Sequence, residues 1–319
     1  MHTEIEFHPL TDKAGFCEGP VAMPDGTLIF VDIEGQTLSR LTTDNKVETI
    51  VPLEGGPNGV AIGKDGAAYV CNNGGVYTFV EIAPGVKIPS PHRPNYTIGS
   101  IQRVDLDTRE VETLYDEGDD YKLIAPDDIV FDSHGGFYFT DTGLEDKEAI
   151  HKGALYYAQP DGSAINFVAQ IPTANGVGLS PDGKTIYVSD TIFGRLWALE
   201  VTAPGKVKET NLPGMPGVAL QTLPGCKSMT GFQWLDSLAV EAGGNICVGT
   251  IFNGGITVFA PDGSYSHVPL EDPFTTNLCF GGADMRDVWI TASSTGTIYK
   301  CRWPRPGLQL EYQELPPAG

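Results

Sequence analysis

The sequence predicts an all-β fold, a six-bladed β-propeller with four antiparallel strands in each blade. Three observations carry this prediction: one pattern recurs six times, every copy holds a hairpin turn between two β-rich runs, and helical periodicity is nearly absent. A two-sheet sandwich or a jelly roll also has many short strands, but neither explains six copies in register. The copies use the whole chain, so residues 1–319 are expected to form a single domain.

The recurring pattern is a polar residue, a short apolar run, a turn and a second β-rich run. The turn is Asp-Gly, Gly-Gly or a similar pair, and the runs around it are rich in Val, Ile, Phe and Tyr, which is typical of a β-hairpin. These runs are the predicted first and second strands of each blade. The six copies span residues 18–32, 58–72, 127–141, 175–190, 236–250 and 277–292.

A third β-rich run follows each pair and begins at a glycine. The six glycines are Gly35, Gly99, Gly153, Gly194, Gly255 and Gly296. A fourth run comes after a further turn, for example over residues 46–51, 110–115 and 165–170. Six such units can close into a ring that leaves few sheet edges exposed, which is the propeller arrangement.

Composition argues against several classes of partner. The chain has 41 acidic and 20 basic residues and a formal charge of −21, which repels both nucleic acid and anionic membranes. No apolar run approaches the roughly 18–20 residues of a membrane span. The acidic N-terminus lacks the basic and apolar segments of a signal peptide, so a cytoplasmic location is expected. A small-molecule substrate is the expected partner, and the oligomeric state is not encoded in any recognisable pattern.

The six cysteines are scattered along the chain and form no C-x-x-C motif. This spacing indicates neither a zinc cluster nor a compact disulfide framework, and it favours buried thiols in a reducing compartment. Cys17 directly precedes the first repeat, where a packed thiol is a commoner role than a reactive one. The cysteines are Cys17, Cys71, Cys226, Cys247, Cys279 and Cys301.

The first residue of each repeat holds a special position, because the first strand of every blade lines the central channel of a propeller. All six residues carry a side-chain oxygen and three are carboxylates, so a cation is the natural counter-charge where they converge. A set of hard oxygen ligands favours Ca²⁺, with Mg²⁺ and Mn²⁺ next and Zn²⁺ less suited. The residues are Glu18, Asn58, Asp127, Asn175, Asp236 and Asn277.

Strand direction places the connections between second and third strands on the same face as these residues. Long connections over residues 74–98, 142–152 and 211–235 are therefore expected to form a lid over the cation and to set specificity. His134 falls in a hairpin turn on the opposite face and has no expected role. Candidate substrate contacts are Asn58, Asp128 and Asn277 beside the cation and His92, Arg93, Tyr96, His151, Phe232 and Trp234 in the lid.

Several motifs together resemble one family over essentially the whole chain. They are Glu18-Gly19-Pro20, Asp127-Asp128 with the run ending at Asp141, Asn175-Gly176 with the run ending at Gly183, and Asp236 with its following Gly-Gly-Asn. The family contains gluconolactonase, senescence marker protein (regucalcin) and luciferin-regenerating enzyme, with squid-type diisopropyl fluorophosphatase more distant. The resemblance implies that Glu18, Asn175 and Asp236 bind a catalytic metal, and Asp127 adds a third carboxylate as a predicted ligand.

The chain departs from the family pattern in the third blade. The family's Arg-Pro-Asn-Asp reads Ala125-Pro126-Asp127-Asp128 here. Because the arginine contacts substrate in sugar-lactone enzymes, its replacement by Ala125 argues against gluconolactone itself. Metal-dependent hydrolysis is the safer part of the resemblance.

The predicted function is metal-dependent hydrolysis of a small cyclic ester, a lactone. The cation would polarise the carbonyl and stabilise the oxyanion, with Asp236 as the candidate general base and Glu18 as the second candidate. No G-x-S-x-G motif indicates a serine nucleophile. Two alternatives are phosphotriester hydrolysis on the same metal and a propeller that binds a ligand without catalysis.

Overall fold

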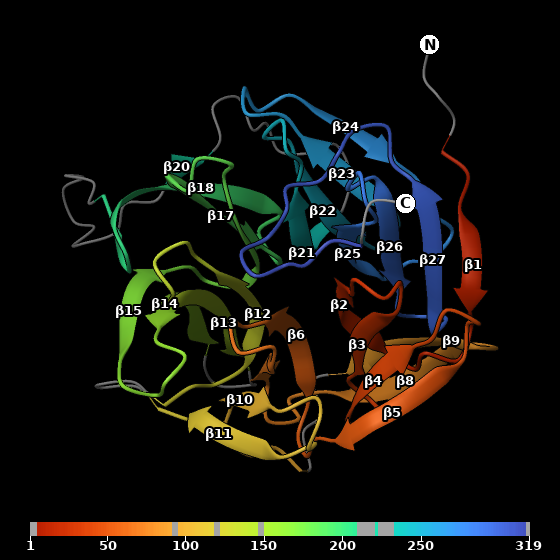
Figure 1. Ribbon diagram of the computed structural model, residues 1–319, viewed down its shortest axis with the longest axis horizontal. Helices are drawn as coiled ribbons and strands as arrows, with labels where there is room; N and C mark the ends of the chain where they lie inside the picture. Colours follow the sequence, from red (N-terminus) through yellow and green to blue (C-terminus); the bar gives the residue numbers. More distant parts are fainter. Residues whose placement is uncertain are drawn as a thin grey trace.

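The structure, a computed structural model, describes residues 5–90, 95–117, 122–145, 150–208, 221–222 and 233–316. Six antiparallel sheets are arranged radially around one axis (Figure 1), which confirms the predicted six-bladed propeller. The innermost strands contact one another in cyclic order, and the last of them contacts the first. Within these described ranges, no helix could cross a membrane.

The first three blades follow the predicted repeats. Blade 1 contains β2 (Cys17–Ala22), β3 (Leu28–Asp32), β4 (Thr37–Leu41) and β5 (Val47–Pro52). Blade 2 contains β6 (Pro57–Ile62), β7 (Ala68–Asn72), β10 (Ser100–Val104) and β11 (Val111–Tyr115). Blade 3 contains β12 (Pro126–Phe131), β13 (Phe137–Glu145), β14 (Ile150–Ala158) and β15 (Ile165–Gln170).

Blades 4 and 5 continue the series. Blade 4 contains β16 (Ala174–Leu179), β17 (Thr185–Asp190), β18 (Arg195–Ala203) and the short β19 (Lys206–Val207), and β20 (Gln221–Thr222) also pairs with β18. Blade 5 contains β21 (Trp234–Val240), β22 (Ile246–Ile251), β23 (Ile256–Phe259) and β24 (Tyr265–Val268).

Blade 6 joins the two ends of the chain. It contains β25 (Thr275–Gly281), β26 (Asp287–Ala292), β27 (Thr297–Arg302) and, as its outermost strand, the N-terminal β1 (His8–Thr11). His8 lies opposite Lys300 in the antiparallel pair, and β1 runs along β27 in Figure 1. Pairing of the first strand with the last fixes the ring in its closed form.

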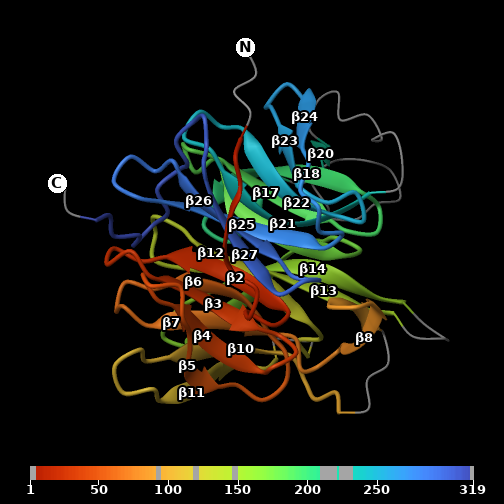
Figure 2. The same ribbon diagram turned by 90° about the vertical axis from the view of Figure 1, so that its right-hand side faces the viewer.

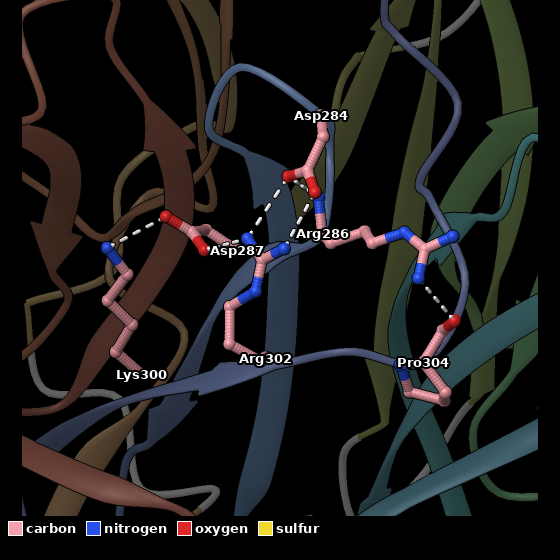
Figure 3. Close-up of polar contacts among 6 residues, drawn as sticks. All are labelled: Asp284, Arg286, Asp287, Lys300, Arg302 and Pro304. Carbon is pink, nitrogen blue, oxygen red and sulfur yellow. Dashed lines mark hydrogen bonds and ion pairs between the residues drawn. The ribbon is translucent and has the colours of Figure 1, made fainter.

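Charged side chains also cross-link blade 6 (Figure 3). Arg302 bridges Asp284 (Nη2–Oδ2, 2.7 Å) and Asp287 (Nη1–Oδ1, 2.5 Å). Lys300 approaches the second oxygen of Asp287 at 3.0 Å, and Arg286 donates to the carbonyl of Pro304. Because the Arg302 side chain is 59% exposed, these pairs orient the strand ends and contribute little free energy of unfolding.

The core lies between neighbouring blades. Strand alternation turns apolar side chains toward the sheets on either side, so each blade packs face to face with its neighbours. Between blades 2 and 3, the Tyr69 ring lies 5.1 Å from Phe131 and 5.9 Å from Phe137, and Phe137 is completely buried. This rigid packing holds the innermost strands at fixed distances from one another.

The C-terminal segment, residues 303–316, covers the face on which the innermost strands end. Leu308 donates its N–H to the Val240 carbonyl in blade 5, and Gln313 donates to the Phe280 carbonyl in blade 6. The Tyr312 ring packs on Phe131 of blade 3 at 5.4 Å. Figure 2 shows the C-terminus on the side opposite β8.

A buried carboxylate anchors this segment. Glu241 is fully buried and accepts hydrogen bonds from Arg305 (Nη2, 2.8 Å), Trp303 (Nε1, 2.7 Å) and Asn245 (Nδ2, 2.7 Å). Burial acts to raise the pKa of Glu241, but these hydrogen bonds outweigh it and the pKa is lowered overall. The ionised form of Glu241 therefore stabilises the folded protein.

Replacing Glu241 with Gln is expected to lower the free energy of unfolding at pH 7 by about 1–3 kcal/mol, because the charged acceptor shared by Arg305, Trp303 and Asn245 is lost. A carboxyl whose pKa is lowered by folding stabilises above its unfolded pKa, about 4.3, and loses that contribution as the pH falls through its folded pKa. The difference from wild type should therefore shrink in urea titrations run from pH 7 down to pH 3. The exposed Glu200→Gln serves as control, and a difference that does not change with pH would contradict the charge-based explanation.

Candidate active site

The six residues that begin the repeats, here called the polar ring, all lie at one end of the innermost strands. Each is buried, with exposed fractions between 3% and 8%. The register of every innermost strand shifts at this point, which marks a β-bulge in all six blades. A bulge bends the strand and re-aims a side chain. The polar ring consists of Glu18, Asn58, Asp127, Asn175, Asp236 and Asn277.

Asparagines of the polar ring orient the carboxylates of adjacent blades. Asn277 Nδ2 donates to Glu18 Oε2 at 2.7 Å, and the Gly19 N–H reaches the same oxygen at 2.6 Å. Asn58 Nδ2 donates to Asp127 Oδ2 at 2.9 Å. Each of these carboxylates thus has one oxygen fixed by amide donors, which sets the direction of the other.

Buried hydroxyl groups satisfy carbonyls of the bulged backbone. Thr140 Oγ1 donates to the Asn175 carbonyl, Ser189 Oγ to the Asp236 carbonyl (2.6 Å) and Thr291 Oγ1 to the Asn277 carbonyl (3.2 Å). The sequence prediction missed these supports. The sequence does contain a pattern that could have revealed them: each of the three hydroxyl residues is the last but one of its repeat.

Carboxylates and amides at the ends of the second strands hold the backbone that leads into the polar ring. Asp141 accepts the N–H groups of Ile124 (2.7 Å) and Ala125 (2.9 Å), just before the ring residue of blade 3. Asp32 and Asn72 accept backbone N–H groups in the same way in blades 1 and 2. These side chains act as positioning residues for the site.

The three carboxyls of the polar ring share one electrostatic environment. Burial raises the pKa of Glu18, Asp127 and Asp236. The negative charge of Glu18 raises the pKa of Asp236 further, and both of these charges raise that of Asp127. No Lys, Arg or His lies within two positions of any ring residue in the sequence. The site is therefore a buried concentration of negative charge.

The polar ring fits a hard divalent cation by its chemistry. Glu18 Oε1 is buried and has no hydrogen-bond partner, which is costly unless a further group satisfies it. Across the described ranges, no three His, Cys, Asp or Glu side chains come together closely enough to hold a metal ion. A cation here would therefore need amide oxygens such as that of Asn175 together with the carboxylates, which is the ligand type that Ca²⁺ accepts.

Asp128, predicted as a substrate contact, serves to join two blades. Its Oδ1 accepts the Ile129 N–H (2.9 Å), and its Oδ2 accepts the Val177 N–H of blade 4 (3.0 Å). Burial raises the pKa of Asp128 to about 7. Contact between Asp128 and substrate stays a prediction, as it does for Asn58 and Asn277.

The predicted lid over residues 74–98 contains a hairpin. Its strands β8 (Thr78–Ala83) and β9 (Val86–Ser90) flank a turn at Gly85, and Figure 2 shows β8 on the face away from the C-terminus. Lys87 donates its N–H to the Ser294 carbonyl in blade 6 and its Nζ lies 2.6 Å from Glu34 in blade 1. The hairpin thus extends from blade 2 to two other blades.

The prediction that the second lid segment forms a loop was wrong. Residues 142–152 were expected to form a long connection, but β13 and β14 continue through most of it, with Gly143 opposite Lys152 and Leu144 opposite His151. Both segments keep an extended backbone beyond the main part of the blade, so they pair through backbone hydrogen bonds. His151 is exposed on this extension.

The remaining lid candidates are partly described. Tyr96 Oη donates to the Ile124 carbonyl (2.9 Å) and so packs beside the backbone that precedes Asp127. Trp234 is half-buried at the start of β21, and its ring lies 4.9 Å from Phe252. His92, Arg93, Phe232 and all of residues 211–235 except 221–222 and 233–235 lie outside the described residues.

The described cysteines are free, buried thiols, as expected. Cys17 is completely buried, and burial, with the negative charge of Glu18, raises its pKa well above the usual value. Such a thiol is protonated at neutral pH and makes a poor nucleophile. Cys226 lies outside the described residues.

Two cavities of 390 and 280 Å³ lie at the opposite end of the innermost strands, beneath the C-terminal segment. Residues such as Val130, Phe280 and Leu310 line both of them. The smaller cavity also reaches Asn277 of the polar ring and the neighbouring Asp128, so it extends from the C-terminal segment toward the ring. The buried carboxylates of the polar ring identify the candidate site better than cavity size does.

Comparison with known proteins agrees with the resemblance found in the sequence. Residues 16–294 match the family described as SMP-30/Gluconolactonase/LRE-like region. Lactonase drp35 of Staphylococcus saprophyticus is 29% identical over 243 residues, which cover 75% of this chain but only 64% of that protein. Gluconolactonase of Zymomonas mobilis is 26% identical over 300 residues, covering 83% of this chain and 72% of that protein.

Solved structures share the fold at lower identity. A gluconolactonase from Xanthomonas campestris superposes with a TM-score of 0.72 at 20% identity, covering 94% of this chain and 90% of the other. A calcium-binding regucalcin from Agrobacterium tumefaciens gives a TM-score of 0.72 at 16% identity, covering 98% and 97%. Both likenesses support the propeller architecture.

Proposed function

We propose, from the premise that the chain belongs to the SMP-30/gluconolactonase/LRE-like family, that this protein hydrolyses a small lactone at the polar ring with the help of a divalent cation. One observation carries the proposal: three buried carboxylates lie in a common electrostatic environment, and one of them, Glu18, has an oxygen without a partner. Relatives named lactonase and gluconolactonase support the reaction class.

The proposed ligands of the cation are Glu18, Asp127, Asn175 and Asp236, whose three carboxylates would have to move closer together around the ion than they lie without it. Their oxygens suit Ca²⁺ first, with Mg²⁺, Mn²⁺ and Zn²⁺ as alternatives. When bound, the cation supplies Lewis-acid polarisation of the ester carbonyl. The neutral side chains Asn58 and Asn277 orient two of the carboxylates through their amide N–H groups.

Asp236 is the proposed general base for the attacking water. The Ser237 N–H holds its Oδ1 at 3.1 Å, which fixes the orientation of the carboxylate. Burial and the charge of Glu18 raise the pKa of Asp236, and a bound cation would oppose this shift and keep the carboxylate ionised, so that it can accept a proton. Glu18 is the second candidate.

The proposed setting is a cytoplasmic enzyme that acts on a free small molecule. The formal charge of −21 supports the small-molecule partner, because it disfavours association with nucleic acid and with anionic membranes.

Hydrolysis assays with Ca²⁺, Mg²⁺, Mn²⁺ or Zn²⁺ added in turn test the proposed function. Lactones of five- and six-membered rings should be hydrolysed at rates that depend on the added cation. Hydrolysis of phosphotriesters but not lactones would replace the proposed substrate class. Failure to turn over either class, together with no measurable cation binding, would favour a propeller that binds a ligand without catalysis.

Replacing Asp127 with Asn tests the third carboxylate. The amide keeps an oxygen for the bond from Asn58 but loses the charge, so cation binding should weaken by about 1–3 kcal/mol, roughly 5- to 150-fold. Calorimetric titration of Ca²⁺ into chelator-stripped protein measures this change. Equal affinities with an altered KM would instead place Asp127 against the substrate.

A further inference from the structure

Aromatic side chains form a continuous arc on the face that carries the polar ring. Ring centroids lie 4.7 Å apart for Phe79 and Phe16, 6.1 Å for Phe16 and Phe274, 5.4 Å for Phe274 and Phe252, and 4.9 Å for Phe252 and Trp234. These spacings are typical of interacting aromatic pairs. The aromatic arc so defined passes over blades 2, 1, 6 and 5.

The aromatic arc lies directly beside the polar ring. Phe16 precedes Glu18 by two residues, and Trp234 precedes Asp236 by two residues. Phe274 likewise stands three residues before the ring residue of blade 6. The same backbone segments therefore supply the arc residues and the ring residues on this face.

Phe252 forms the exposed part of the arc and has an unusual backbone conformation. Its φ is +67°, in the left-handed region that bulky side chains rarely adopt, and its N–H donates to the Pro273 carbonyl at 2.6 Å. The residue is nevertheless 43% exposed, whereas Phe16 and Phe274 beneath it are buried. A strained, exposed aromatic residue beside a candidate active site is more readily explained by ligand contact than by folding.

The apolar surface continues into blade 4. Ile192 and Phe193, in the turn between β17 and β18, are 46% and 56% exposed. A Cβ built on the next residue, Gly194, would lie 3.0 Å from the carbonyl of Gln233, the neighbour of Trp234. Arg195 lies 5.9 Å from the centroid of the Phe193 ring, so this end combines apolar side chains with one cation. Exposed apolar side chains beside a candidate site favour a ligand with apolar groups.

We propose that the aromatic arc binds an apolar substituent of the substrate, so that the protein prefers lactones bearing an alkyl or aryl group to polyhydroxylated lactones. This inference rests on the proposed lactone hydrolysis. Aromatic side chains occur within two positions of the ring residues in blades 1 and 5, where no basic side chain does. Burial of one methylene group against the arc should raise kcat/KM about threefold to fourfold, from roughly 0.8 kcal/mol per methylene.

Three lactones with the same six-membered ring test the preference. δ-Decalactone carries a pentyl chain, δ-valerolactone carries no substituent and glucono-δ-lactone carries hydroxyl groups. The expected kcat/KM for δ-decalactone exceeds that of each of the others at least tenfold. Equal or higher values for glucono-δ-lactone would overturn the inference while leaving lactone hydrolysis intact.

Phe252→Gly tests the arc itself. Glycine adopts φ +67° without strain, which offsets part of the packing lost against Trp234 and Phe274, so the protein should stay folded, but the ratio of kcat/KM for δ-decalactone to that for δ-valerolactone should drop at least fivefold. Tyr265→Ala is the control, because Tyr265 is an exposed aromatic residue on the outermost strand of the same blade and should not change the ratio. An unchanged ratio in Phe252→Gly would overturn the inference.

A binding measurement separates this inference from the proposed reaction. The δ-lactam that carries the same pentyl chain resists hydrolysis, and calorimetry should show at least fivefold weaker binding to Phe252→Gly than to wild type. If no lactone is hydrolysed but the lactam behaves in this way, the proposed function fails and the aromatic arc stands as a binding site. Equal affinity for wild type and variant would overturn the arc regardless of hydrolysis.

Discussion

Replacing Asp236 with Asn is expected to lower kcat for lactone hydrolysis by about 10²–10⁴-fold at saturating cation, because the isosteric amide cannot accept a proton from water. The same change should stabilise the protein in the absence of metal. The charge of Glu18 raises the pKa of Asp236, and the charge of Asp236 raises that of Asp127, so removing the Asp236 charge relieves repulsion in the ring. A stabilisation of roughly 1 kcal/mol raises the melting temperature of a domain of this length by about 1–2 °C.

The opposite signs of these two effects distinguish a role in catalysis from a role in folding. A residue needed for the fold would lose activity and stability together. Asp161→Asn, in an exposed turn of blade 3, supplies the control and should change neither quantity. Near-normal kcat in Asp236→Asn at saturating cation would remove this residue from the proposed mechanism and leave Glu18 as the candidate base.

Removal of divalent cations should abolish hydrolysis and lower the melting temperature. A cation that binds only the folded state stabilises it by about 2.7 kcal/mol at a concentration 100 times its Kd. Adding back Ca²⁺, Mg²⁺, Mn²⁺ or Zn²⁺ in turn should restore activity and stability to different extents, and so identify the ion that the polar ring prefers. Thermal unfolding and initial rates, measured on the same samples, check both effects.

A matched variant shows whether the cation acts at the polar ring. Glu18→Gln keeps an oxygen for the bond from Asn277 but loses the charge beside the unpartnered Oε1. Cation-dependent stabilisation should therefore be much smaller in Glu18→Gln than in wild type. Full activity of wild type after exhaustive chelation, with elemental analysis showing no bound metal, would refute cation dependence.

The repeat pattern alone predicted the number of blades and the residues of the polar ring. Both follow from local rules: alternating apolar residues mark strands, Asp-Gly and Gly-Gly pairs mark hairpins, and the start of each innermost strand recurs at the same point of every repeat. The five described cysteines were also expected to be buried thiols, and they are. These features depend on neighbours within about fifteen residues in the chain.

Local sequence patterns did not predict the hairpin β8–β9 or the extension of β13 and β14. The sequence has β-rich segments on both sides of Pro84-Gly85. Contacts with blades 1 and 6 determine where the hairpin that they form lies. Residues 142–152 were predicted as a loop because no repeat position required strands there. β13 and β14 pair beyond the blade, where Gly143 lies opposite Lys152. This pairing depends on both strands together, and the sequence of neither strand alone indicates it.

The sequence by itself determined which residues start the innermost strands, whereas only the tertiary structure decided how those residues interact. The bond from Asn277 to Glu18 joins residues 259 positions apart, and β1 pairs with β27 from the other end of the chain. Both depend on closure of the ring, which brings the first and last blades together. Each of the six bulges is a mismatch in register between two paired strands, so it is defined only once the strands have paired. Local patterns therefore fix the elements, and packing between blades fixes the site.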